Sequence, residues 1–144
     1  MVGPLAMMSC ASAARTEDLA AVTFGLEAEV TLAEMTRHER GFYYRDVEVG
    51  TGATAEAGKS VQVAYVVRLA DGREVDRTER EQPVRFRVGD GTAVAAFDAG
   101  VRGMRAGGTR QLVVPPRLAY GARGAGPIPP NSVLVMMVRL ERVE

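Results

Sequence analysis

The first pattern in the sequence that could do chemistry is a relaxed form of the phosphate-binding loop. Ala53 is followed, after four residues, by Gly58-Lys59-Ser60, but the strict pattern has glycine at its first position. A phosphate loop also needs a helix directly after it, with the N-terminus of that helix facing the phosphate. Residues 61–69 instead alternate between apolar and polar side chains, as a strand does. The sequence therefore argues against nucleotide binding.

Residue counts limit the other chemistries. The 144 residues include one Cys and one His, which excludes an internal disulfide, a thiolate metal cluster and any metal site that needs two imidazoles. The acidic residues Asp90 and Asp98 lack the spacing of a calcium-binding loop. The 18 basic and 18 acidic side chains cancel, so the basic excess typical of nucleic-acid binding is missing. No apolar run reaches the ~18–20 residues that cross a bilayer.

A set of aromatic residues and one carboxylate remains: Tyr65, Asp76, Phe97 and Tyr120. Taken alone, each aromatic residue is more typical of a core position than of a binding site, and Asp76 is more typical of a turn or a surface. Whether these residues act together depends on the elements that carry them.

Those elements are predicted to be short strands and one helix, separated by Gly, Pro and Asp. Strands are predicted at residues 43–49, 61–69, 84–88, 110–114 and 133–143, a helix at 93–101 and a Gly/Pro loop at 118–130. The pair Asp71-Gly72 predicts a tight hairpin. A sheet that buries one face under a single helix makes a two-layer core. The predicted fold class is α+β, a five- to six-stranded antiparallel half-barrel sheet wrapped over one short helix.

Residues 1–40 are predicted to be an N-terminal leader or arm, and residues 41–144 the folded domain. Residues 24–32 alternate in polarity, which favours an extra edge strand or packing arm, although a helical stripe through Leu19, Val22, Leu26 and Val30 also fits. His38 lies in a polar run and is predicted to belong to a solvated connector.

The order of features resembles the FKBP-type peptidyl-prolyl cis-trans isomerases over about residues 41–144. The most specific pieces are the stretches VAYVVRLADGREVD from Val63 and AYGARGAGPIPPNSVL from Ala119. Further matches are Pro83–Phe86, Gly89, Phe97–Gly100, Met104 and Gly107. The resemblance implies the half-barrel fold and an activity that accelerates rotation about X–Pro bonds in proline-containing polypeptides. Such a rotation breaks no bond, so it needs no nucleophile, metal or redox cofactor.

The resemblance also implies which residues form the site. Phe97 matches the floor of a proline-binding pocket, where the family usually has Trp. Tyr65 matches a wall aromatic, Asp76 the pocket carboxylate, and Tyr120 the hydroxyl that bonds a substrate carbonyl. These four are the expected catalytic residues. The expected substrate-binding residues are Val75, Val84, Phe86, Val94, Ile128 and Met136.

The sequence departs from the family pattern inside this set. Val75, Val84 and Met136 stand where the family usually has aromatic residues, and the loop before Ile128 is one residue short. An Arg that often partners the pocket carboxylate has no clear counterpart, so the Tyr65 hydroxyl and Arg77 or Arg80 are the candidate partners of Asp76. We therefore expect a wider, less aromatic pocket with weakened affinity for the macrolide ligands of the family. An alternative is a proline-peptide-binding or chaperone-like module of the same fold with little turnover.

The segment from Leu5 to Cys10, followed by small residues, resembles the end of a bacterial lipoprotein signal, in which a Cys after a small residue carries the lipid. Residues 1–9 contain no basic residue, so this interpretation requires a start upstream of Met1. In that case a lipid on Cys10 is the only link to a membrane, and the protein lies in the cell envelope or periplasm. The alternative is a disordered leader on a cytoplasmic protein.

Overall fold

The computed structural model describes residues 19, 24–25, 30–78, 82–91 and 95–144. The predictions for Cys10, Arg80 and Val94 lie outside these residues. Within the described part, no helix combines the length and the apolar character that crossing a bilayer requires.

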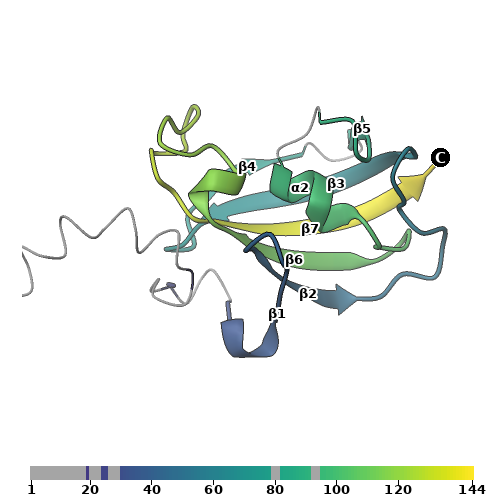
Figure 1. Cartoon of the computed structure of the whole chain (residues 1–144), viewed down its shortest axis with the longest axis horizontal. Helices are drawn as coiled ribbons and strands as arrows, with labels where there is room; N and C mark the ends of the chain where they lie inside the picture. The colour runs from purple at the N-terminus through teal and green to yellow at the C-terminus, as the bar shows by residue number, and fades with distance from the viewer. Residues whose placement is uncertain (1–18, 20–23, 26–29, 79–81, 92–94) are drawn as a thin grey trace, which may run out of the picture.

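The described residues form one antiparallel sheet with a helix across one face (Figure 1). The strands are β1 (Thr36–Arg37), β2 (Tyr43–Glu48), β3 (Ser60–Leu69), β4 (Glu74–Arg77), β5 (Val84–Arg87), β6 (Thr109–Val114) and β7 (Leu134–Val143). Their order is β1-β2-β6-β7-β3-β4, and β5 also pairs with β3. The helix is α2 (Ala95–Val101), and 3-10 turns lie at η3 (Leu32–Glu34) and η4 (Pro116–Leu118). The predicted α+β class is confirmed. This part has seven strands instead of five or six, because β1, with two residues, and β4, with four, are not among the predicted ranges.

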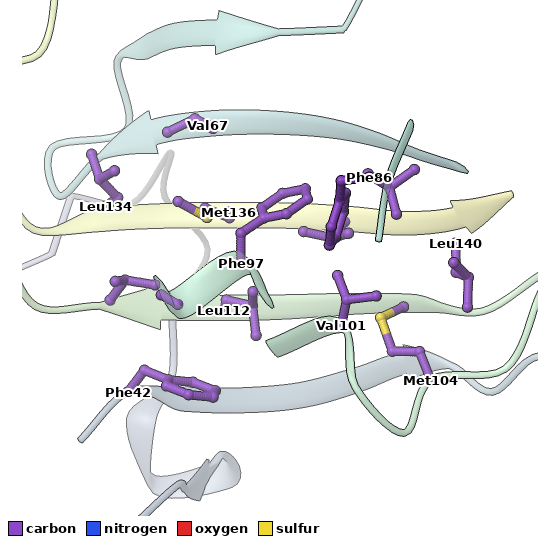
Figure 2. Close-up of a cluster of buried hydrophobic side chains, with 14 of the residues drawn as sticks. Phe42, Val67, Phe86, Phe97, Val101, Met104, Leu112, Leu134, Met136 and Leu140 are labelled. Atoms are coloured by element: carbon purple, nitrogen blue, oxygen red, sulfur yellow. The ribbon is translucent and has the colours of Figure 1, made fainter. Parts of the chain in front are cut away.

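The core lies between the sheet and α2 because apolar residues alternate along the long strands. Figure 2 shows Leu134, Met136 and Leu140 of β7 on the side of the sheet that faces Phe97 and Val101 of α2. Burying each large apolar side chain contributes roughly 1.5–3 kcal/mol. The helix comes close to β6 at Gly100, where an added Cβ would lie 2.6 Å from a methyl carbon of Leu112.

The opposite face of the sheet, which we call the outer face, is covered in part by residues that precede β1. Leu19 is buried with Val113, Val133 and Val135, and half-buried side chains including Phe24 and Val30 pack against this cluster. The described residues therefore support a packing arm. The strand predicted at 24–32 is wrong where the structure describes it: residues 24–25 and 30–31 form no strand, and Leu32 begins η3. The extra edge strand is β1, which pairs with β2.

His38 differs from its predicted role as a solvated connector. Its ring is half-buried and stacks on Phe42 with 4.3 Å between ring centroids. Its Nδ1 accepts a hydrogen bond from the backbone N–H of Arg40 at 3.1 Å. The His38 side chain is buried in part because the face of its ring stacks on Phe42. The polar neighbours of His38 in the sequence do not reveal this contact.

Candidate functional site

A cavity of about 340 Å³ opens between α2, the β3–β5 side of the sheet and the long loop before β7. All four residues expected to be catalytic line it, together with four of the six expected to bind substrate. The lining residues are Tyr65, Val67, Asp76, Val84, Arg85, Phe86, Phe97, Tyr120, Ile128 and Met136. Residues up to 71 positions apart in the chain, from Tyr65 to Met136, therefore meet around one hollow.

Three aromatic rings make the inner wall of this cavity. Phe97 projects from α2 and is only 8% exposed. The Tyr65 ring of β3 meets it edge-on, with 5.3 Å between centroids and planes at 78°. The Phe86 ring of β5 lies 5.4 Å from it, tilted by 56°. Figure 2 shows the Phe97 ring between Met136 and Phe86. Edge-to-face contacts of this kind stabilise a pair by about 0.5–1.5 kcal/mol beyond the area they bury. This wall is therefore apolar, and α2, β3 and β5 hold its three rings in place.

Asp76 lies at the mouth of the cavity and not at its bottom. The residue is exposed, and its Oδ2 accepts a hydrogen bond from the Tyr65 hydroxyl at 3.3 Å. Burial, and then the Asp76 charge and hydrogen bond, raise the pKa of Tyr65 above its usual value, so the phenol stays protonated. Of the predicted partners of Asp76, Tyr65 is thus confirmed, whereas the Arg77 guanidinium hydrogen-bonds Glu74, with Nε at 2.8 Å from Oε2.

Tyr120 and Ile128 reach the cavity from the loop that follows η4. The backbone of Ala125 and Ile128 forms two mutual hydrogen bonds of 3.0 and 2.8 Å, which closes a tight turn. At Gly124 (φ +68°) an added Cβ would lie 2.3 Å from the Ile128 carbonyl oxygen, so a glycine is required there. The turn buries Ile128 at the lip, and Tyr120 stands at the rim with 38% of its surface exposed. The Tyr120 phenol is thereby available to a ligand.

The three positions that depart from the family pattern differ in what they do. Met136 is buried in the wall, and Val84 stands at the rim, 40% exposed. Val75 packs half-buried against the core but is not among the residues that line the cavity. The β3–β4 register is irregular at this point: Val67 pairs with Asp76 and Arg68 with Glu74, which leaves Val75 as an extra residue without a partner in the ladder.

Two lining residues were missed by the sequence analysis. Val67 lies two residues after Tyr65 on β3 and therefore faces the same side, so strand alternation carries a signal for it. Arg85 lies between Val84 and Phe86, and its guanidinium pairs with Glu144. Nothing in the local pattern distinguishes Arg85 from the neighbouring Arg87.

A broader hollow of about 950 Å³ lies on the outer face of the sheet. Its floor comes from the other alternation of β3 and β7, including Ala64, Val66 and Met137, and its rim carries charged residues such as Arg139 and Glu141. Arg139 Nε lies 3.4 Å from Glu141 Oε1. The smaller cavity is the candidate site, because it combines the aromatic rings of Phe86 and Phe97 with the Tyr120 side chain at its rim.

Comparison with known proteins gives the same result as the geometry. The FKBP-type peptidyl-prolyl cis-trans isomerase family matches residues 52–141. The 46 kDa FK506-binding nuclear protein of Spodoptera frugiperda is 42% identical over 106 residues, which are 72% of this chain and 26% of that protein. FK506-binding protein 4 of Rhizopus delemar is 38% identical over 108 residues, 74% of this chain and 28% of that protein. The chain thus spans about a quarter of the length of the curated relatives it matches.

Solved structures match over more of their length. The crystal structure of AtFKBP13 has a TM-score of 0.71 and 34% sequence identity, and the match covers 77% of this chain and 99% of that one. The crystal structure of FkpA from Escherichia coli has a TM-score of 0.72 and 32% identity, covering 93% of this chain and 58% of that one. Since the family match takes in most of the chain and contains every residue of the cavity wall, the chain belongs to the FKBP-type peptidyl-prolyl cis-trans isomerase family.

Proposed function

We propose that this chain accelerates cis–trans rotation about X–Pro peptide bonds in flexible polypeptides. The observation that carries the proposal is the convergence of Tyr65, Asp76, Phe97 and Tyr120 on one apolar cavity. The proline ring would lie against Phe97, with Phe86, Met136 and Ile128 around it. Val75 and Val94 belong to the proposed substrate-binding set on the strength of the resemblance alone.

The barrier to be lowered is amide resonance, about 18–20 kcal/mol. Rotation passes through a twisted amide, which has lost resonance and separates less charge than the planar form. An enzyme accelerates this step when it binds the twisted amide more tightly than the planar one. A water-shedding cavity favours the less polar, twisted form, because the planar amide loses more hydration on entering it. The apolar wall around Phe97 is the part of the site suited to this task.

The hydroxyl groups position the substrate. The exposed Tyr120 phenol is placed to donate a hydrogen bond to a carbonyl that flanks the proline. A net hydrogen bond of this kind contributes about 0.5–1.5 kcal/mol. Tyr65 stays protonated and holds Asp76 at the mouth of the cavity. Asp76 acts in this scheme as an oriented carboxylate at the rim and not as a general base, since rotation requires no proton transfer.

A protease-coupled assay with a proline-containing peptide tests the proposal. The wild-type chain should isomerise the peptide faster than buffer, and Phe97→Ala and Asp76→Ala should each reduce the rate. If the peptide isomerises no faster with the wild-type chain than in buffer alone, the chain is not a prolyl isomerase.

The second candidate is a module that holds proline-containing chains with little turnover. The half-exposed Val84, where the family usually has an aromatic residue, favours it, because a wider rim grips the substrate less firmly. We also propose weakened binding of FK506-like macrolides at the same cavity. Titration with such a macrolide separates the two candidates: binding without isomerase activity identifies the module, and binding with activity identifies the enzyme.

We propose separately that Cys10 carries a lipid, on the evidence of the sequence around it alone. Expression in a bacterial host with the in-frame sequence upstream of Met1, followed by fractionation, tests this: the protein should sediment with membranes, and Cys10→Ala should release it. Equal distribution of both proteins in the soluble fraction would contradict the proposal.

A further inference from the structure

Tyr65 lies at a break in the sheet. On one side, β3 pairs with β7 from Val61 to Leu69, with one irregularity between Gln62 and Val63, and this ladder includes Tyr65. On the other side, β5 pairs with residues 60–63 and β4 with residues 66–68, so neither ladder includes Ala64 and Tyr65. A residue between two ladders needs another partner for its backbone, because unpaired N–H and C=O groups in a half-buried strand are costly.

Thr78 provides that partner. It is the first residue after β4, and its backbone N–H donates to the Tyr65 carbonyl at 3.0 Å. Its hydroxyl Oγ1 accepts a hydrogen bond from the Tyr65 N–H at 3.1 Å. In a regular antiparallel pair the acceptor would be a backbone carbonyl. Here the side chain takes that position at the point where the chain leaves the sheet.

Through these bonds, Thr78 joins Asp76 and Phe97 as a contact of Tyr65. Tyr65 is held at two points, on its backbone by Thr78 and on its phenol by Asp76 of β4. The same Tyr65 ring packs edge-on against Phe97 at the cavity floor. Thr78 itself is half-buried and lines the outer hollow, on the other side of the strand from the cavity. Its hydrogen bonds to the Tyr65 backbone connect it to the cavity wall.

We propose that Thr78 is a positioning residue for the site: its hydroxyl fixes the backbone of Tyr65 so that the Tyr65 phenol meets Asp76 at the mouth of the cavity. This inference rests on the proposed function for its catalytic consequence, and on the contacts of Tyr65 for its structural one. The hydroxyl, and not the bulk of the side chain, is the group that matters.

Three variants of the full chain separate these contributions. Thr78→Val keeps the shape and removes the acceptor, Thr78→Ser keeps the hydroxyl and removes the methyl group, and Thr109→Val is a matched control. Thr109 is also a half-buried threonine that lines the outer hollow, but it lies on β6, away from Tyr65. Thr78→Ala serves as a second hydroxyl-free variant if the valine destabilises the fold.

Two readouts are measured on each folded variant. The first is kcat/KM in the protease-coupled assay, where Thr78→Val should lose about two- to tenfold, the equivalent of one hydrogen bond, while Thr78→Ser and Thr109→Val stay within about twofold of wild type. The second is the ultraviolet titration of Tyr65, isolated by subtracting the same variant with Tyr65→Phe. Thr78→Val should shift this titration towards lower pH, because the phenol moves away from Asp76.

The second readout keeps the proposal distinct from the proposed function. If the wild-type chain shows no isomerase activity, the proposed enzymatic function is wrong. The titration of Tyr65 still tests whether Thr78 positions Tyr65. An unchanged titration in both Thr78→Val and Thr78→Ala would overturn the positioning role. Equal losses in Thr78→Ser and Thr78→Val would also overturn it, since the hydroxyl would then not be responsible.

Discussion

The inner and outer faces of the sheet are made by the same strands and differ in what covers them. On the inner face, α2 lies over the alternate residues of β3 and β7, and its Phe97 ring closes the floor of the cavity. On the outer face, Leu19 and its neighbours cover one region, and the hollow beside Met137 has a rim that includes the Arg139–Glu141 ion pair. The wall that contains the Phe97 and Phe86 rings thus lies on the face under the helix. The comparison teaches that the proposed chemistry depends on this coverage, since both faces have hollows.

The largest effect is expected from removing the floor of the cavity. Phe97→Ala should lower the free energy of unfolding by about 3–5 kcal/mol and abolish isomerase activity, because it removes both core packing and the surface that faces the proline. Urea unfolding and the protease-coupled assay measure the two effects. Leu112→Ala is the matched control: Leu112 is fully buried beneath α2 but does not line the cavity, so its folded fraction should stay active. An active Phe97→Ala variant would break the link between the floor and function.

A truncation on the outer face should affect stability alone. Leu19 is 2% exposed, so Leu19→Ala should cost about 2 kcal/mol or more of unfolding free energy. Its kcat/KM, measured well below the unfolding temperature, should stay within about twofold of wild type. A parallel loss of activity would show that the two faces are coupled more strongly than the comparison implies.

The Tyr65–Asp76 pair gives a smaller effect with a pH signature. Tyr65→Phe removes one hydrogen bond and should reduce kcat/KM by about two- to tenfold. The pKa of Tyr65 is raised in the folded chain, so its contribution to stability is present below the usual tyrosine pKa of about 10 and is lost as the pH rises through the folded value. Unfolding measured across this alkaline range should therefore show a steeper loss for wild type than for Tyr65→Phe. Identical pH profiles would contradict the pairing.

The rim of the cavity should respond least. Val84→Phe adds apolar area at a position that is 40% exposed and should raise macrolide affinity by about fivefold, the equivalent of roughly 1 kcal/mol of additional burial. Calorimetric titration measures this. Val47→Phe is the control, because Val47 is similarly exposed on β2 but away from the cavity. A gain of the same size in both variants would mean that the effect is unspecific.

The sequence predicted the inner face better than the outer one, and the cause is physical. Period-two alternation identifies a strand with one buried face, so β3, β5 and β7 were predicted to within a residue or two. Residues 24–32 alternate too, but the described ones form no strand, because packing on Val113 and Val135 replaces ladder pairing there. Strand β1 has only two residues, which is too few to show an alternation of apolar and polar side chains.

The candidate site was predicted largely by resemblance, and its misses follow from local backbone detail. Val75 is the extra residue at the irregularity between β3 and β4 and does not line the cavity, and side-chain polarity does not reveal an irregular register. Asp76 was expected inside an apolar pocket and is exposed at its mouth, which lowers the cost of keeping it charged. The contact between Thr78 and Tyr65 could not be predicted from the sequence, because it depends on the residue at which β4 ends.

The turn that carries Ile128 has a kinetic consequence for any ligand. Its backbone groups are already paired with one another, and the N–H of Asn131 donates to the Gly121 carbonyl at 2.8 Å, so the loop is joined at its base as well as at its tip. A polypeptide that brings a proline to the cavity does not have to order this lip, because that entropy was lost when the chain folded. Capture should then resemble the docking of two rigid shapes, with an association rate governed by encounter and not by loop closure.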